Sequence, residues 1–408
     1  MNASLSHRGP DGDGFHFEPG VALGHRRLSI IDLEGGKQPL YNEDETVVVT
    51  YNGEIYNFKE LATELQALGH VFRTHCDTEV IVHAWEEWGV ACLERFNGMF
   101  AFGLWDRNRE TLFLARDRVG IKPLYFAVLA DGQLSFGSEL KAVMHNPSVG
   151  RELDPRSVED YFTFGYVPEP RTIYKAVSKL EPGTYLCAER GKPVPEPVRY
   201  WDVPLDAPSR PVSDFDATCG ELREQLKAAV DRRLVADVPL GAFLSGGIDS
   251  SAVVAMMREL DTESILTCSI GFKEERYDES KYADMVAAAK QTNHKKETVE
   301  ASDYDLLDRL VGFYDEPYAD SSAIPTYRVC ELARKHVTVA LSGDGGDENY
   351  IGYRRYNLFS MEEKIRAAFP DWFRKPVFGF LGDYYPKLDW APRVFRGKTT
   401  FQALGRSS

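Results

Sequence analysis

The chain has 408 residues with 63 acidic and 48 basic side chains, a formal net charge of −15 and 43% hydrophobic residues. This length suffices for two domains with separate cores, and the composition excludes a disordered or fibrous protein. The acidic balance argues against nucleic-acid partners and favours small molecules. No apolar run is long enough to span a membrane, the first residues contain no apolar signal core, and the six cysteines form no C-x-x-C pair. We therefore expect a cytoplasmic protein in a reducing compartment.

The first half of the chain alternates short strands with amphipathic helices. Sequence patterns predict strands over 21–33, 46–51, 99–105, 111–116, 123–128 and 133–136. Helical spacing predicts helices over 57–68 and 78–96. In the first of these helices, Phe58, Leu61, Leu65 and Leu68 are predicted to share one buried face. The pattern predicts an α+β domain over 1–192, in which layered antiparallel sheets carry helices on the outside.

Proline becomes frequent between 193 and 212, where a regular helix or strand cannot be sustained. We therefore expect a linker over 193–213 and a second domain over 214–408. The patterns of the second domain predict helices over 221–234 and 250–259 and buried strands over 238–244, 266–272 and 337–341. Short apolar runs between helices are typical of parallel strands buried on both faces, so we predict an α/β domain with a doubly wound parallel sheet.

The most specific motif of the second half is Leu244-Ser245-Gly246-Gly247-Ile248-Asp249-Ser250-Ser251, between a predicted strand and a predicted helix. Adjacent glycines let successive backbone N–H groups turn toward one point, and the start of the helix adds its positive end. The loop is therefore predicted to hold a pyrophosphate group, with Asp249 at Mg²⁺. A tight strand-to-helix turn without a ligand is the alternative interpretation of the two glycines alone.

A second Gly/Asp loop, Ser342-Gly343-Asp344-Gly345-Gly346-Asp347-Glu348, follows the predicted strand over 337–341. Ligands of open parallel sheets bind beyond the carboxyl ends of the strands, so both loops are predicted to open on one crevice and to form an ATP site. Taken alone, the second loop is equally typical of a solvated acidic turn. The acids of Asp315-Glu316-Pro317, at a predicted helix end, are also consistent with plain surface charge.

Together with Ser269-Ile270-Gly271-Phe272, these two loops resemble the pyrophosphate-loop ATPase domain of glutamine-hydrolysing asparagine synthetases. The resemblance implies a ligase that uses ATP and Mg²⁺ to adenylate the side-chain carboxylate of aspartate or a related acid. Ammonia then attacks the adenylate to give asparagine, AMP and pyrophosphate. The implied ATP-binding residues are Leu244, Ser245, Gly246, Gly247, Asp249, Ser250, Ile270, Ser342 and Gly343. The resemblance also implies that Asp249 and Asp347 bind the metal and that these two residues and Glu348 are catalytic.

The first half is similar to the glutaminase domain of the same family, which has a fold of the N-terminal-nucleophile hydrolase type. The motifs that carry this similarity are His7-Arg8-Gly9-Pro10-Asp11, Gly24-His25-Arg26-Arg27-Leu28-Ser29-Ile30-Ile31-Asp32, Tyr51-Asn52-Gly53-Glu54-Ile55-Tyr56-Asn57 and Asp77-Thr78-Glu79. By resemblance, Arg27 clamps the carboxylate of glutamine, and Asn52 and Gly53 form the oxyanion hole. Glu54 and Asp77 would hold the amino group. The other implied glutamine-binding residues are Leu28, Ser29, Ile30 and Ile31. Taken singly, Asn52-Gly53 is typical of an ordinary turn, and an isolated arginine is typical of a surface charge.

Departures from the family pattern lead to further expectations. Family glutaminases use an N-terminal cysteine upstream of the motif that begins here at His7, so we expect that nucleophile to be absent and the chain to be truncated at both ends. Cys76 is a poor substitute, because no amine is adjacent to it, so we expect no glutaminase activity from the chain as written.

A second departure lies in the other half of the chain. Glu348-Asn349-Tyr350-Ile351-Gly352-Tyr353 stands where asparagine synthetases read Glu-Leu-Phe-Gly-Gly-Tyr. This difference leaves open a polysaccharide-related carboxylate as the acceptor, as in exosortase- and exopolysaccharide-associated amidotransferases.

The sequence leaves other functions open as well. The fold could serve as a non-catalytic glutamine- or nucleotide-binding module, which would show no aspartate-dependent pyrophosphate exchange. A pyrophosphate-loop enzyme acting on RNA is disfavoured by the acidity and by the first half of the chain. The expected partners are glutamine or ammonia, aspartate or a related carboxylate, and ATP. A homodimer is left open, and neither nucleic acid nor a membrane is expected.

Overall fold

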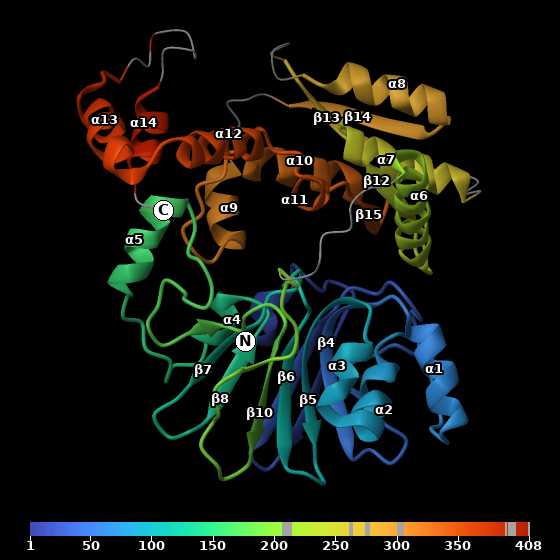
Figure 1. Ribbon diagram of the computed structural model, residues 1–408. Helices are drawn as coiled ribbons and strands as arrows, with labels where there is room; N and C mark the ends of the chain where they lie inside the picture. Colours follow the sequence, from blue (N-terminus) through green and yellow to red (C-terminus); the bar gives the residue numbers. More distant parts are fainter. Residues whose placement is uncertain are drawn as a thin grey trace. The chain divides into compact units, whose positions relative to one another are not determined.

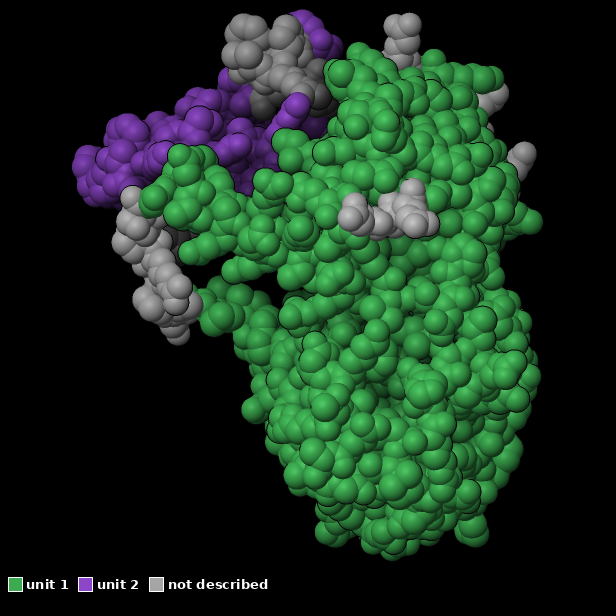
Figure 2. Space-filling model, turned by 90° about the vertical axis from the view of Figure 1, so that its right-hand side faces the viewer, with its two compact units in different colours: residues 1–342 green, residues 343–408 purple. Residues whose placement is uncertain are grey.

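The computed structural model describes residues 1–205, 214–260, 264–273, 278–299, 306–387, 390 and 397–406. Contacts divide the chain into two units, Met1–Ser342 and Gly343–Ser408, which are green and purple in Figure 2. Within these described residues, no helix is both long enough and apolar enough to cross a membrane. Residues 206–213 of the predicted linker lie outside the described residues, so the domain boundaries stay a prediction.

The largest sheet of the first unit has six antiparallel strands in the order β11-β10-β6-β5-β4-β3. Their bounds are Leu40–Tyr41 (β3), Val47–Ile55 (β4), Gly98–Asp106 (β5), Thr111–Arg116 (β6), Thr184–Glu189 (β10) and Val198–Arg199 (β11). Alternate side chains of β4 and β5, such as Val49 and Phe102, are buried on one face, as the two-residue period of a strand requires. The amphipathic helices α1 (Phe58–Ala67) and α2 (Glu79–Trp88) cover this face (Figure 1), and Leu65 of α1 packs into the same core.

The opposite face of this sheet carries two smaller antiparallel sheets, the hairpin β1-β2 and the three-stranded sheet β8-β7-β9. Their bounds are Gly12–Glu18 (β1), Val21–Arg27 (β2), Tyr125–Val128 (β7), Leu134–Gly137 (β8) and Ser178–Lys179 (β9). Leu23 packs with Val48 and Trp105, and Leu124 packs with Leu114, so apolar side chains fill the space between the layers. The short helices of this half are η1 (Asn2–Leu5), η2 (Gly89–Ala91), α3 (Cys92–Arg95), α4 (Leu140–Met144) and α5 (Pro155–Phe164). This layering confirms the predicted α+β fold.

The remaining sheet of the first unit is parallel, with the strand order β14-β13-β12-β15. Its strands are Leu240–Phe243 (β12), Leu266–Phe272 (β13), Asn293–Val299 (β14) and Val339–Leu341 (β15), and its helices are Phe215–Arg232 (α6), Ile248–Glu259 (α7), Ser280–Lys290 (α8), Leu307–Phe313 (α9) and Ala323–Arg334 (α10). Successive residues of β12 point to opposite faces. Ala242 packs with Val254 of α7 and Ala283 of α8, whereas Phe243 packs with Leu332 of α10. Helices therefore cover both faces, which confirms the predicted α/β fold.

The described residues of the second unit are mainly helical. Its helices are Gly346–Tyr350 (α11), Arg354–Ala368 (α12), Asp371–Tyr384 (α13) and Lys398–Gly405 (α14). Arg374 of α13 is buried, and its guanidinium donates a hydrogen bond to the main-chain oxygen of Leu404 (3.3 Å), which joins α13 to the end of α14. A buried guanidinium needs such acceptors, because it cannot lose its proton.

Several predicted elements differ from the structure for local reasons. The predicted strand over 21–33 is shorter, because β2 ends at Arg27 and a turn follows. The predicted helix over 78–96 breaks after α2 at Gly89, whose φ of +56° ends the helix. Leu68 was predicted to share the buried face of the first helix, but it is 52% exposed, since α1 ends one residue earlier.

Candidate functional site

Arg27 is the last residue of β2, and its guanidinium closes the turn that follows. It donates hydrogen bonds to the main-chain oxygens of Ile31 (3.3 Å), Asp32 (2.7 Å) and Leu33 (2.8 Å). The carboxylate of Asp32 in turn accepts a hydrogen bond from the main-chain N–H of His75 (2.8 Å). Arg27 is therefore a cation fixed by its own turn, and the interpretation as an isolated surface charge is wrong.

Asn52 and Gly53 lie within β4, where Asn52 pairs with Ala101 and Gly53 with Phe100 of β5. The interpretation of these two residues as an ordinary turn is therefore wrong. A Cβ on Gly53 would lie 2.1 Å from the main-chain oxygen of Met99, so a larger residue does not fit. The side-chain nitrogen of Asn52 is buried and has no hydrogen-bond partner among the described residues. Because an unpaired buried donor is destabilising, this nitrogen is suited to a ligand oxygen.

Glu54 and Asp77 are an acidic pair, and the pKa of each carboxyl is raised in the folded chain. Asp77 is buried and accepts hydrogen bonds from the Tyr51 hydroxyl (2.7 Å) and the main-chain N–H of Ile55 (2.9 Å). Burial raises the pKa of Asp77. Burial and the charge of Asp77 raise the pKa of Glu54 to about 8, although Lys122 opposes this shift. Surroundings that disfavour two carboxylates without a counterion favour a bound cation, such as the ammonium group of an amino acid.

These side chains line one cavity of about 1010 Å³, bounded by residues of β1, β2, β4, β5 and β8. The predicted glutamine-binding residues that line it are Arg27, Leu28, Ile30, Ile31, Asn52, Gly53, Glu54 and Asp77. Ser29 is not among them, and its main-chain N–H donates instead to the carboxylate of Asp11 (2.9 Å). The structure thus gathers residues that are far apart along the chain around one space.

The cavity also contains residues to which the sequence assigned no role. Lys122 lines it, and burial lowers the pKa of this lysine. Lys122 belongs to no motif in the sequence. Tyr51 begins one of the motifs, but the sequence does not indicate its contact with Asp77. Cys76 also lines the cavity, and burial raises the pKa of its thiol. A thiol held in its protonated form is a weak nucleophile, in agreement with the expectation for Cys76.

The loop between β12 and α7 is held by its own hydrogen bonds. The Ser250 hydroxyl lies 3.0 Å from the Ser245 hydroxyl, which accepts a hydrogen bond from the main-chain N–H of Gly247 (3.2 Å). Gly246 has a φ of +83°, and a Cβ there would lie 2.5 Å from the main-chain nitrogen of Ala283 in α8. Only glycine meets both demands. Gly247 then caps α7, where free N–H groups favour an anion.

The carboxyl ends of β12, β13 and β15 lie at one edge of the parallel sheet. Leu244 follows β12 and donates its main-chain N–H to the oxygen of Cys268 in β13 (2.9 Å). Ile270 lies two residues further along β13, and Ser342 follows β15, which pairs with β12 on the other side. Asp249 is half-buried in the first turn of α7. The predicted ATP-binding residues of the first unit therefore lie around this edge.

Gly343, Asp347 and Glu348 belong to the second unit, so their approach to the edge of the sheet stays a prediction. Within that unit, the carboxylate of Glu348 accepts a hydrogen bond from the Tyr353 hydroxyl (2.6 Å), which lowers the pKa of Glu348. A Cβ on Gly352 would lie 1.9 Å from the carboxylate of Asp347, so this carboxylate would have to move if the glycine were replaced. The loop is thus ordered by contacts of its own.

Asp315 and Glu316 are not plain surface charges, and that interpretation is wrong. Their side chains are only 10% and 11% exposed. Asp315 pairs with the ammonium of Lys141 (3.0 Å) and accepts a hydrogen bond from the main-chain N–H of the same lysine (2.8 Å). Glu316 accepts a hydrogen bond from the main-chain N–H of Ile173 (2.7 Å) and pairs with the ammonium of Lys179 (2.6 Å). These contacts join a segment of the second half of the chain to the first half, within the first unit.

Known families and proteins match both halves of the chain. Residues 1–201 match the family described as a glutamine amidotransferase domain, and residues 221–407 match the family described as asparagine synthase. "Asparagine synthetase [glutamine-hydrolyzing] 1" of Bacillus subtilis is 40% identical over 358 residues, which cover 87% of this chain and 55% of that protein. "Putative asparagine synthetase [glutamine-hydrolyzing] 2" of Methanocaldococcus jannaschii is 40% identical over 377 residues, which cover 86% of this chain and 72% of that protein.

The matched region covers 55% of the length of the Bacillus relative, so the chain spans little more than half of that protein. Among solved structures, a glutamine phosphoribosylpyrophosphate amidotransferase from B. subtilis aligns with a TM-score of 0.35 and 16% identity, over 72% of this chain and 61% of that chain. A similarity of this size supports no argument about the site.

Proposed function

The chain belongs to the family of glutamine-hydrolysing asparagine synthetases, and from this premise we propose that it is a ligase that forms an amide from ATP, a carboxylate and ammonia. In the proposed reaction, a side-chain carboxylate oxygen of aspartate attacks the α-phosphorus of ATP and displaces pyrophosphate. Ammonia then attacks the acyl carbon of the adenylate, loses a proton and displaces AMP, which leaves asparagine. Adenylation is needed because a free carboxylate has no good leaving group.

The observation that carries this proposal is the loop of β12 and α7, where Gly246 has a left-handed conformation without room for a side chain. Its backbone and the N-terminus of α7 supply N–H groups for the negative charge of departing pyrophosphate. Carboxylate oxygens are the donors that Mg²⁺ prefers, and the half-buried Asp249 at this loop fits that ion. We assign Asp249 and Asp347 to Mg²⁺, which when bound offsets charge on the phosphates.

For the first half, we propose that the cavity holds glutamine. Arg27 would pair with its α-carboxylate, and Glu54 and Asp77 with its ammonium group. The unpaired side-chain nitrogen of Asn52 would donate to the amide oxygen. Cys76 is the cysteine that lines the cavity in the described part of the chain, and its raised pKa makes it a weak nucleophile. We therefore propose that this chain by itself takes free ammonia rather than hydrolysing glutamine.

Exchange of labelled pyrophosphate into ATP tests the adenylation step. We expect the full chain to catalyse this exchange only when aspartate and Mg²⁺ are both present. Gly246→Ala should lower the rate at least about 100-fold, because the Cβ displaces the loop from the phosphates. Gly132→Ala is the matched control, since Gly132 has the same φ of +83° but nothing within 4 Å of the added Cβ.

The outcomes separate the candidate functions. Exchange that requires another carboxylate in place of aspartate would move the acceptor to that compound. If the folded chain binds ATP but shows no pyrophosphate exchange, whichever carboxylate is added, it would instead be a binding module. Equal losses in Gly246→Ala and Gly132→Ala would contradict the role of the loop.

A further inference from the structure

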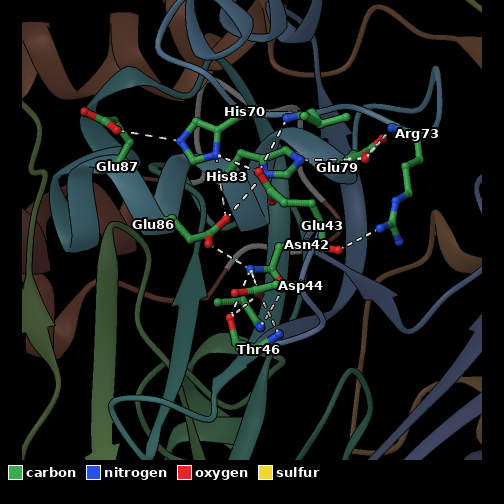
Figure 3. A network of polar contacts seen from close by, with 12 residues as sticks. Asn42, Glu43, Asp44, Thr46, His70, Arg73, Glu79, His83, Glu86 and Glu87 are labelled. Atoms are coloured by element: carbon green, nitrogen blue, oxygen red, sulfur yellow. Dashed lines mark hydrogen bonds and ion pairs between the residues drawn. The ribbon is translucent and has the colours of Figure 1, made fainter.

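Four side chains without a role in the proposed reaction face one another beside α2. They are Glu43, His70, His83 and Glu86, and their ligand atoms all lie within 4.8 Å of one another (Figure 3). Glu43 lies in the turn between β3 and β4, and His70 follows α1. His83 and Glu86 lie three residues apart in α2 and therefore share one face of that helix.

Several distances between these side chains are close to those of a tetrahedral set of ligands. His83 Nδ1 lies 3.1 Å from Glu43 Oε2 and 3.3 Å from Glu86 Oε2. His70 Nδ1 lies 3.5 Å from Glu43 Oε1 and 3.9 Å from Glu86 Oε2. Ligand atoms bound to tetrahedral zinc at about 2.0–2.1 Å lie about 3.3–3.4 Å from one another. One ion therefore fits among the four side chains after small movements.

Each imidazole turns Nδ1 toward this centre and Nε2 toward another carboxylate. His83 Nε2 lies 3.7 Å from Glu79 Oε1, and His70 Nε2 lies 3.6 Å from Glu87 Oε2. Metal-bound histidines almost always have a carboxylate, carbonyl or water at the nitrogen that does not bind the metal. The two imidazoles thus have the surroundings of metal ligands on both sides of the ring.

Within the described part of the chain, hydrogen bonds leave two buried atoms of this cluster without a partner. His83 is fully buried, and neither its Nε2 nor Oε2 of Glu43 has a hydrogen-bond partner among the described residues. Oε1 of Glu86 accepts a hydrogen bond from the side-chain nitrogen of Asn42 (2.7 Å), whereas Oε2 lies at hydrogen-bond distance from Nδ1 of His83 (3.3 Å) and faces the centre. The two carboxylates are half-buried, and an ion at the centre would bind Oε2 of Glu43, which has no hydrogen-bond partner among the described residues.

We propose that Glu43, His70, His83 and Glu86 bind one Zn²⁺ ion. Two imidazole nitrogens and two carboxylate oxygens suit this metal. The protein would fill all four coordination positions, so the site is structural rather than catalytic. The ion fastens the turn before β4 and the segment after α1 to α2. The segment between α1 and α2 also contains Asp77, which lines the cavity. The ion would therefore stabilise the position of this segment.

The metal content of the purified full chain tests this proposal. After EDTA treatment, reloading with ZnCl₂ and gel filtration, we expect one Zn²⁺ per chain by mass spectrometry of the metal. Co²⁺ in the same site should give the visible absorption of a tetrahedral ion without a thiolate band in the near ultraviolet. The missing thiolate band separates this site from the exposed thiols of Cys219 and Cys330.

Substitutions locate the ion. His70→Asn and Glu86→Gln should each weaken zinc binding at least about 100-fold, and Glu87→Gln about 10- to 100-fold through the orientation of His70. His145→Asn is the matched control, because His145 is exposed and outside the cluster. Circular dichroism must first show that each variant is folded, and His83 is left unchanged because it is fully buried.

Two results would overturn the proposal. One is a reloaded wild-type chain that is folded but free of zinc, which would leave a hydrogen-bonded cluster. The other is a zinc content that stays the same in folded His70→Asn and Glu86→Gln, because the ion would then lie elsewhere.

Discussion

Glu54 carries a carboxyl whose proton affinity depends on the fold. Burial and the charge of Asp77 raise its pKa from 4.5 to about 8. Between these two values the native chain holds a proton that the unfolded chain has released, so the native state binds more protons. The contribution of Glu54 to stability therefore falls as the pH rises from about 4.5 to about 8, and the whole loss is present above the higher value. A bound ammonium group would remove this cost, which makes Glu54 suited to a ligand rather than to stability.

Glu54→Gln should therefore stabilise the chain at high pH. The neutral amide avoids the buried charge, so the advantage over the wild type should grow by about 2 kcal/mol between about pH 5 and about pH 8.5. This value is less than the full shift implies, because the side chain is partly exposed to the cavity. Urea unfolding at the two pH values, followed by tryptophan fluorescence, measures it. Glu60→Gln, at an exposed position of α1, is the control, and an equal pH response in both variants would contradict the prediction.

At the scale of the element, β4 serves both the core and the cavity through its alternation. Val49, Tyr51 and Ile55 belong to the core under α1 and α2. Asn52 and Glu54 have the opposite parity in the strand, so they turn to the other face. Gly53 is required between them because β4 and β5 approach closely there.

Gly53→Ala should separate β4 from β5. Its Cβ would lie 2.1 Å from a main-chain oxygen, which cannot move as the end of a flexible side chain can. We expect a loss of about 1–3 kcal/mol in the free energy of unfolding. Gly12→Ala in β1 meets nothing within 4 Å and should change stability by less than about 0.5 kcal/mol. Equal unfolding midpoints in urea for the two variants would show that the strands can adjust.

At the scale of the whole molecule, nearly buried charges join the two halves of the chain within the first unit. The pairs of Asp315 with Lys141 and of Glu316 with Lys179 are each less than a quarter exposed. Such pairs are less screened by water than those on the surface, and losing one partner leaves the other charge without compensation.

Glu316→Ala should loosen this junction. The ammonium of Lys179 loses its carboxylate and the main-chain N–H of Ile173 loses its acceptor, so we expect a loss of about 3 kcal/mol. Faster hydrogen exchange at the amide of Ile173 would report it. Glu110→Ala removes an exposed partner of Arg190 and should cost less than about 1 kcal/mol. Unchanged exchange at Ile173 in the first variant would mean that apolar packing alone holds the halves together.

The sequence by itself determined the features that depend on near neighbours. The patterns over 111–116 and 266–272 coincide with β6 and β13, since alternation and turn residues are local signals. The strands β1, β10 and β14 were not predicted. The strands β3, β9 and β11 were also missed, because two residues carry no periodicity. The motifs around Gly246 and Asn52 indicated the family, since backbone demands at a ligand leave few alternatives to glycine.

Only the tertiary structure decided which distant residues meet. The family resemblance had already grouped Arg27, Asn52 and Asp77, and the structure places them around one cavity. The structure alone changed Asp315 and Glu316 from surface charges into partners of lysines. It also gathered the four proposed zinc ligands, whose positions form no motif along the chain. Strand register and helix packing set these approaches through contacts far apart in sequence, and burial then altered the charges. No local pattern encodes either effect.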